Sequence, residues 1–242
     1  MLDSPFVVAV VAVAAGAVAA VSGFGLGSIL TPLLVLSFPT SSAVALVAIP
    51  HAVATTVRWW RLRRDVNGPT FRQFGIASAL GGLAGAALQP FLGGTALTVV
   101  LGVLLVLAGG SELMRRRVPL PPTPFWRLAG GILSGAFGGL VGNQGGIRAA
   151  ALLGFQLPPR ALVATATASA LFVDAARVPI YIAHSRAVLA ANVPLWLAAS
   201  AGALVGTFIG VPILSRIPES PYRVILGALL VLLGVALLAT AR

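Results

Sequence analysis

The residues best placed to bind a ligand lie in two glycine-rich breaks inside long apolar segments. The first break covers residues 22–28, with the sequence Ser-Gly-Phe-Gly-Leu-Gly-Ser, and the second covers residues 142–146, with the sequence Gly-Asn-Gln-Gly-Gly. Non-helical backbone at membrane depth persists only where it is buried in protein or lines a water-filled cavity. Interrupted segments at matching positions of two halves are typical of the substrate site of a transporter. The candidate substrate-binding residues in the breaks are Gly23, Gly25, Gly27, Ser28, Asn143, Gln144, Gly145 and Gly146.

An arginine follows the second break directly. Arg148 could bind an oxyanion in fork geometry, beside backbone N–H groups that the break leaves open. The amides of Asn143 and Gln144 could orient the oxygens of the same anion, or could satisfy opened backbone carbonyls. An ionisable residue inside a membrane is by default a functional hypothesis. The alternative is that Arg148 reaches the membrane surface or forms a structural pair with Asp174.

A second polar group has helical spacing later in the chain. Asp174, Arg177 and Tyr181 follow the spacing i, i+3, i+7, which places them on one face of a helix. An acid and a base on one face nearly neutralise each other, so a structural ion pair explains them as well as a functional role does. In the functional interpretation, Asp174 positions one of the arginines or takes up a coupling proton. We therefore name these three residues as coupling or gating candidates.

The first half contains a histidine in a similar position. His51, Thr55 and Arg58 follow the spacing i, i+4, i+7 on one helix face. A neutral imidazole can be buried at low cost and can still titrate near physiological pH, which makes His51 a further candidate for proton coupling. The alternative is a histidine that is hydrogen-bonded to a neighbouring carbonyl.

The composition identifies the class of protein. The 242 residues are 58% hydrophobic and 9% charged, with a mean hydropathy of +1.02, which is typical of a polytopic membrane protein. The net charge of +11 comes from sixteen arginines, and such a charge alone does not indicate nucleic acid binding. With no cysteine, two histidines and five acidic residues, we expect no metal site and no cofactor.

The arginines also indicate how the chain is oriented. One group flanks a loop over residues 58–72 and another flanks a loop over residues 115–127, with two apolar segments between them. Both loops therefore lie on one side, which the positive-inside rule assigns to the cytoplasm. We expect a multi-pass protein of the inner, cytoplasmic membrane that contacts lipid, does not bind nucleic acid and is compatible with a homo-oligomer.

The hydrophobic pattern predicts an all-α membrane protein with about eight segments, four in each half. They lie near residues 5–38, 41–60, 71–92, 95–112, 125–157, 159–183, 188–214 and 220–240. The first segment of each half is longer than one span needs and contains the break, so each should hold two helical pieces. A proline-rich linker over residues 118–124, predicted to be non-helical, separates a repeat over 1–117 from a repeat over 125–242.

The relation between the two repeats has two solutions. The stretch 99–109 matches the stretch 224–234 at eight of eleven positions, which supports an internal duplication. If each broken segment crosses the membrane, the copies are parallel; if each is re-entrant, the copies are inverted. Small residues at a spacing of four, at Gly81/Gly85 and Gly135/Gly139, predict close packing between helices.

At these residues the chain resembles the TauE/SafE-type sulfite exporter family, also called the TSUP permeases. The resemblance runs nearly from end to end and is strongest over residues 138–148, 158–166 and 173–181. It implies an inner-membrane permease for small anions such as sulfite, sulfoacetate or other organosulfonates.

We therefore expect a secondary transporter of small anions whose broken segments meet near the middle of the membrane. The backbone of both breaks and Arg148 would hold the anion, and His51 or Asp174 would couple transport to protons. Two alternatives stay open: an anion channel that uses the same residues, and a membrane-embedded enzyme. The enzyme is disfavoured because no Gly-x-Ser-Gly motif occurs and neither histidine has an evident serine partner.

Overall fold

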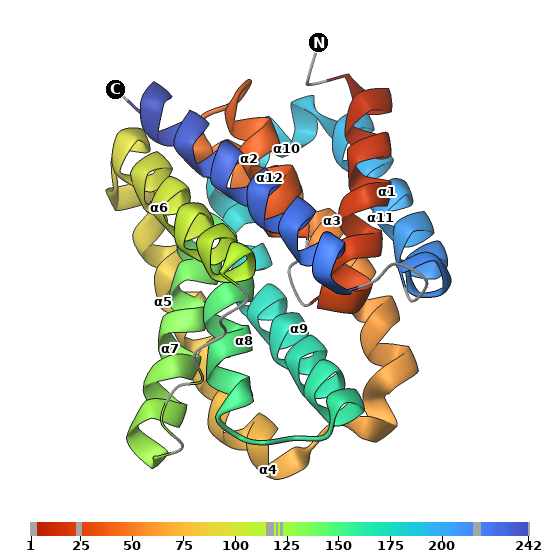
Figure 1. Cartoon of the computed structure of the whole chain (residues 1–242). Coiled ribbons are helices and arrows are strands. Elements are labelled where there is room, and N and C mark those ends of the chain that lie inside the picture. Colours follow the sequence, from red (N-terminus) through yellow and green to blue (C-terminus); the bar gives the residue numbers. More distant parts are fainter. Residues whose placement is uncertain are drawn as a thin grey trace.

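The computed structural model describes residues 4–22, 26–114, 119, 121, 123–214 and 219–241, and within these ranges all regular structure is helical (Figure 1). Before the linker, the helices are α1 (Pro5–Ser22), α2 (Leu26–Val35), α3 (Thr40–Leu62), α4 (Gly68–Thr70), α5 (Ile76–Leu88) and α6 (Gly94–Leu113). Three short turns connect them: 3-10 turns over Arg63–Asp65 and Gln89–Phe91, and a π turn over Phe71–Gly75. After the linker follow α7 (Pro124–Val141), α8 (Gly145–Leu153), α9 (Pro159–His184), α10 (Arg186–Ala191), α11 (Val193–Leu214) and α12 (Glu219–Thr240).

Several helices are long enough and apolar enough to cross a membrane. Within the part of the chain that the structure describes, five stretches qualify by length and composition, at Thr40–Asp65, Gly68–Phe91, Gly94–Leu113, Pro159–His184 and Pro221–Thr240. Shorter apolar helices cover Pro5–Ala20, Leu26–Val35 and Val193–Ile209. The chain is therefore a multi-pass helical membrane protein, as its composition predicts.

Prolines set the start of three helices. Pro39 precedes α3 and Pro158 precedes α9, both in an extended conformation that cannot continue a helix backwards. The prediction of a non-helical linker is wrong at its last residue, because Pro124 is the first residue of α7. A proline is tolerated there since the first N–H of a helix has no partner within the helix. Thr123 caps this end, and its side chain accepts a hydrogen bond from the backbone N–H of Trp126.

Each predicted long segment contains two helices that fold back on each other. Figure 1 shows α1 running away from the N-terminal end of the molecule and α2 returning toward that end. The pair α7 and α8 forms a similar hairpin from the opposite end, where Arg127 near the start of α7 stacks over the Phe155 ring just after α8. The predicted division of each segment into two helical pieces is confirmed. The turn between α7 and α8 is buried inside the molecule.

The turn of the second hairpin depends on one glycine. Gly142 ends α7 with a φ of 72°, in the left-handed region that glycine adopts without strain. Its N–H donates to the Gly138 carbonyl, which closes the last turn of α7. Asn143 and Gln144 then connect to α8, so both amides lie inside the turn. The corresponding Gly23 and Gly25 of the first break lie outside the described residues.

Three helix pairs join the part of the chain before the linker to the part after it. The most extensive packing is between α1 and α11, between α5 and α7, and between α6 and α12. Glycines allow this close approach: a methyl group on Gly135 would overlap the Ser78 carbonyl, and one on Gly81 would overlap the Ile132 carbonyl. The predicted close packing at these small residues is confirmed. The two halves of the chain therefore interlock instead of forming separate bodies.

Candidate functional site

The start of α2 contacts the turn between α7 and α8. A side chain on Gly27, near the start of α2, would overlap the carbonyl of Gly142. One residue further on, the Ser28 hydroxyl donates to Asn143 Oδ1 at 3.0 Å, and both side chains are buried. Four of the predicted binding residues, Gly27, Ser28, Asn143 and Gln144, belong to this contact or border it directly.

Several polar atoms at this contact have no partner. Among the described residues, Asn143 Nδ2 and both side-chain polar atoms of Gln144 are buried without a hydrogen bond, and so is the hydroxyl of Thr31 on α2. A buried donor or acceptor that is left unpaired costs about 1–3 kcal/mol. Such groups in a membrane protein are suited to receive a polar ligand or water.

A cavity lies next to the second break. Its volume is about 690 Å³, and most of its lining is apolar and comes from α6. Asn143, Gln144 and Gly146 also line it, so the unpaired amides border open space. The cavity could admit a ligand to the turn of the second hairpin.

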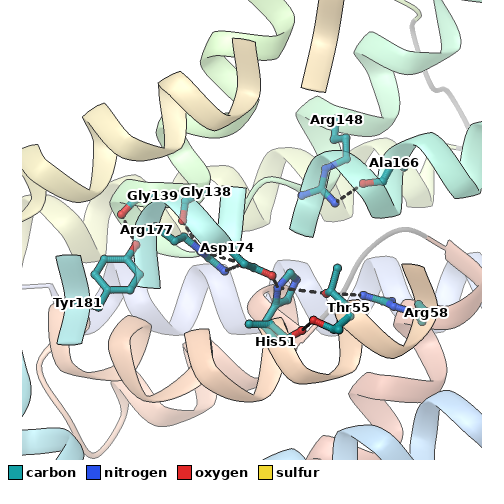
Figure 2. Close-up of polar contacts among 12 residues, drawn as sticks. His51, Thr55, Arg58, Gly138, Gly139, Arg148, Ala166, Asp174, Arg177 and Tyr181 are labelled. Atoms are coloured by element: carbon teal, nitrogen blue, oxygen red, sulfur yellow. Dashed lines mark hydrogen bonds and ion pairs between the residues drawn. The ribbon is translucent and has the colours of Figure 1, made fainter. Parts of the chain in front are cut away.

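Arg148 lies one turn into α8 and is only 7% exposed. Its one hydrogen bond in the described structure is long, from Nη1 to the Ala166 carbonyl at 3.5 Å (Figure 2). No described carboxylate forms an ion pair with it. Arg148 is within electrostatic range of the Asp174 carboxylate, and also of Arg58 and Arg177, which carry the same charge. Its guanidinium is therefore buried and available for an anion.

Asp174 is fully engaged by other residues. Its Oδ2 lies 2.6 Å from His51 Nδ1, and its Oδ1 accepts from Arg177 Nε at 3.0 Å and pairs with Arg177 Nη2 at 2.8 Å. All three side chains are buried. The structural pair that Asp174 forms is thus with Arg177 and His51, and not with Arg148. His51 contacts a carboxylate and not a neighbouring carbonyl, so this contact connects α3 to α9.

Arg177 and Tyr181 also hold the end of α7. Arg177 Nη1 donates to the Gly138 carbonyl and the Tyr181 hydroxyl donates to the Gly139 carbonyl (Figure 2). The last carbonyls of a helix carry partial negative charge, so a cation and a hydroxyl both stabilise them; the Gly138 carbonyl also accepts from the Gly142 N–H. Gln89 also binds this end of α7, because its Nε2 donates to the Leu140 carbonyl at 2.7 Å. The sequence analysis missed Gln89, although a buried glutamine in an apolar segment beside a proline is a usable signal.

The polar chain continues from Asp174 into the first half. Thr55 Oγ1 lies 3.5 Å from His51 Nδ1, and Arg58 Nη2 donates to the same hydroxyl at 3.0 Å. Arg58 Nε is buried without a partner among the described residues. Figure 2 shows these groups as one connected line from Arg177 on α9 to Arg58 on α3, with Tyr181 beside Arg177. The structure thus brings together His51, Asp174, Arg177 and Tyr181, with Arg148 beside them.

The charges in this region do not cancel. Three guanidinium groups, at Arg58, Arg148 and Arg177, share one carboxylate at Asp174. With a neutral His51, the three arginines and one carboxylate give the region a net charge of +2; Arg148, Arg177 and Asp174 are buried, and Arg58 is half-buried. Buried charge without a partner is costly in a protein. The region is therefore complementary to an anion.

One of three comparisons with known proteins found a match. Residues 8–237 match the family model described as "Sulfite exporter TauE/SafE", which covers nearly the whole chain. No curated protein and no solved structure matches the chain.

The hydrogen bonds from Arg177 to Asp174 and to the end of α7 give a prediction about stability. In Arg177→Gln, the Asp174 carboxylate loses its main countercharge and the Gly138 carbonyl loses a charged donor, so we expect a loss of about 3–5 kcal/mol. Asp174→Asn combined with Arg177→Gln should cost less than the two single changes added together, because neither partner is then left as an isolated charge. Thermal unfolding of the purified protein in detergent measures each variant.

Arg160→Gln is the matched control, because Arg160 is exposed and pairs with Asp65 at 3.0 Å. An exposed pair of this kind contributes about 0–1 kcal/mol. If the effects of the two buried changes were simply additive, the pair would have no special role in holding α7.

Proposed function

Because the chain belongs to the sulfite exporter TauE/SafE family, we propose that it is a secondary transporter that carries small anions of the sulfite type across the cytoplasmic membrane. The family is one of membrane transporters, and the helices here suit a multi-pass membrane protein. The observation that carries the proposal is the buried guanidinium of Arg148, which has no carboxylate partner among the described residues and lies one turn after a break with unpaired amides.

We propose that the anion binds where the second hairpin turns. The first N–H groups of α8, around Gly145 and Gly146, lack acceptors within the helix and carry partial positive charge, which favours an anion. Arg148 adds a full charge, and the unpaired amides of Asn143 and Gln144 orient the oxygens. Gly27 and Ser28, at the start of α2, close the site from the other half.

We further propose that the chain consists of two inverted repeats, and the glycine contacts support this. Gly16 on α1 approaches Ala203 on α11, and Gly135 on α7 approaches Ser78 on α5. A shift of 119 residues takes Gly16 to Gly135, and a shift of 125 residues takes Ser78 to Ala203. The glycine of each contact is therefore equivalent to the glycine of the other, and Ala203 is equivalent to Ser78. The contact between α1 and α11 corresponds to the contact between α7 and α5 when the two repeats are interchanged.

The same shift of 125 residues also fits the pair formed by α6 and α12. Gly102 contacts Gly234 and Gly109 contacts Gly227, which makes these two helices antiparallel. Equivalent helices that pack antiparallel across a two-fold relation belong to inverted copies. Inverted repeats allow alternating access by movement of one repeat against the other.

This topology gives a first prediction. The arginine-rich loop after α3 and the C-terminal end of α12 lie at opposite ends of the molecule (Figure 1). A reporter fused after Thr240 should therefore be active on the external side, and a reporter fused after Arg64 on the cytoplasmic side. Two fusions on the same side would favour parallel repeats.

The second prediction concerns anion binding. In liposomes with purified protein, uptake of radiolabelled sulfite should be saturable, and Arg148→Ala should reduce the affinity for sulfite at least roughly tenfold, because a charge-assisted hydrogen bond is lost. The variant should still fold, since Arg148 contributes little to the internal bonds. Arg160→Ala is the control with an exposed arginine. Unchanged affinity in a folded Arg148→Ala variant would remove Arg148 from the site.

The third prediction concerns proton coupling at His51. This residue links α3 to α9 through Asp174, so its protonation adds a charge at the contact between the two halves. His51→Gln keeps a polar side chain there but cannot titrate near neutral pH. We expect the pH dependence of sulfite uptake to become flat. His184→Gln is the control, because His184 is exposed and contacts the Ile180 carbonyl of its own helix. A pH profile like that of the unmodified protein would exclude His51 from coupling.

A further inference from the structure

Arg58 on α3 and Arg177 on α9 occupy equivalent positions in the two halves. The shift of 119 residues that relates the repeats takes Arg58 to Arg177 and Thr55 to Asp174. The local contacts agree: each arginine donates to the residue three positions before it, Arg58 to Thr55 at 3.0 Å and Arg177 to Asp174 at 3.0 Å. The first half therefore has a neutral hydroxyl where the second half has a carboxylate.

This difference leaves the charge of Arg58 uncompensated. The described residues include no acid in an ion pair with Arg58, and its buried Nε has no partner. A hydroxyl can accept a hydrogen bond but cannot neutralise a guanidinium. Arg177, by contrast, has the Asp174 carboxylate at 2.8 Å and the Gly138 carbonyl, so its donors are already used.

The free charge of Arg58 lies near the free charge of Arg148. The two guanidinium groups are within electrostatic range of each other. Figure 2 shows both at the Thr55 end of the polar chain, away from Tyr181 and from the carbonyls that Arg177 and Tyr181 bind. Arg148 comes from the second half and Arg58 from the first. Two like charges repel each other, so an anion that contacts both guanidinium groups would stabilise this arrangement.

We infer that the site takes a small oxyanion with two negative charges, held by Arg148 of one half and Arg58 of the other, with Arg58 as a second substrate-binding residue. This inference rests on the proposed transport function. The net charge of the region is +2, so a dianion neutralises it and a monoanion leaves one guanidinium unpaired. Arg177 does not contribute to binding, because Asp174 neutralises it and the end of α7 uses its donors.

Binding of purified protein in detergent tests the inference, with isothermal titration at one mildly alkaline pH. The probes are sulfite and sulfate, which are dianions there, and methanesulfonate, a monoanion of similar size in which a methyl group replaces one oxygen of sulfate. We expect at least one dianion to bind roughly tenfold or more tightly than methanesulfonate, because it gains one further charge-assisted contact.

Three variants on α3 test whether Arg58 causes the preference for dianions. Arg58→Gln should weaken dianion binding by roughly 10- to 100-fold and should change methanesulfonate binding little, which removes the preference. Arg58→Lys keeps the charge and should keep most of the preference. Arg61→Gln is the matched control, because Arg61 is exposed and lies one turn further along the same helix.

The outcomes separate the inference from the proposed function. If methanesulfonate binds as tightly as the dianions, the chain binds anions but the preference for two charges is wrong. If Arg58→Gln keeps the preference, Arg58 is not a ligand. If none of the three anions binds to folded protein, the proposed function itself is overturned. Should Arg58→Gln fail to fold, the unmodified protein and Arg58→Lys still test the inference. It is contradicted if the unmodified protein binds methanesulfonate as tightly as the dianions.

Discussion

Backbone that stops being helical inside a membrane must find its hydrogen-bond partners within the protein, and the arrangement of this chain depends on that constraint. The second hairpin exposes the last carbonyls of α7 at the point where Gly142 turns the chain. Arg177, Tyr181 and Gln89 each donate to one of these carbonyls. Asp174 balances the charge of Arg177, and His51 contacts Asp174 from the first half of the chain. Arg177, Asp174 and His51 are thus explained first by the needs of the backbone.

This constraint separates two roles among the arginines. An arginine that has an acid and a carbonyl, as Arg177 has, is part of the framework. Arg148 has only one long hydrogen bond to a carbonyl and no ion pair with a described acid, so its charge is available to a ligand. The sequence places both types in apolar segments without distinguishing them. The distinction comes from which side chain reaches the acid, and this depends on how α8 and α9 pack.

The helical architecture, the breaks and the face formed by Asp174, Arg177 and Tyr181 could be predicted because each has a local signal: apolar length, glycine content and helical spacing. The contact between His51 and Asp174 joins residues 123 positions apart, and no local pattern encodes it. The role of Gln89 was missed for the same reason, since its partner is a backbone carbonyl on another helix. Whether the broken segments turn back could not be decided from apolar length, because both solutions need the same number of apolar residues.

The contact between Gly27 and Gly142 tolerates little substitution. A side chain on Gly27 would overlap the Gly142 carbonyl, and a side chain on Gly142 would be strained by the φ of 72° there, so substitution at either position is disfavoured. The positions around Arg58 and Thr55 are under no such restriction, because they bear on a charge and not on a backbone contact. In the proposed role of Arg58, a change at this helix position alters the charge that faces the anion and leaves the contact between Gly27 and Gly142 intact.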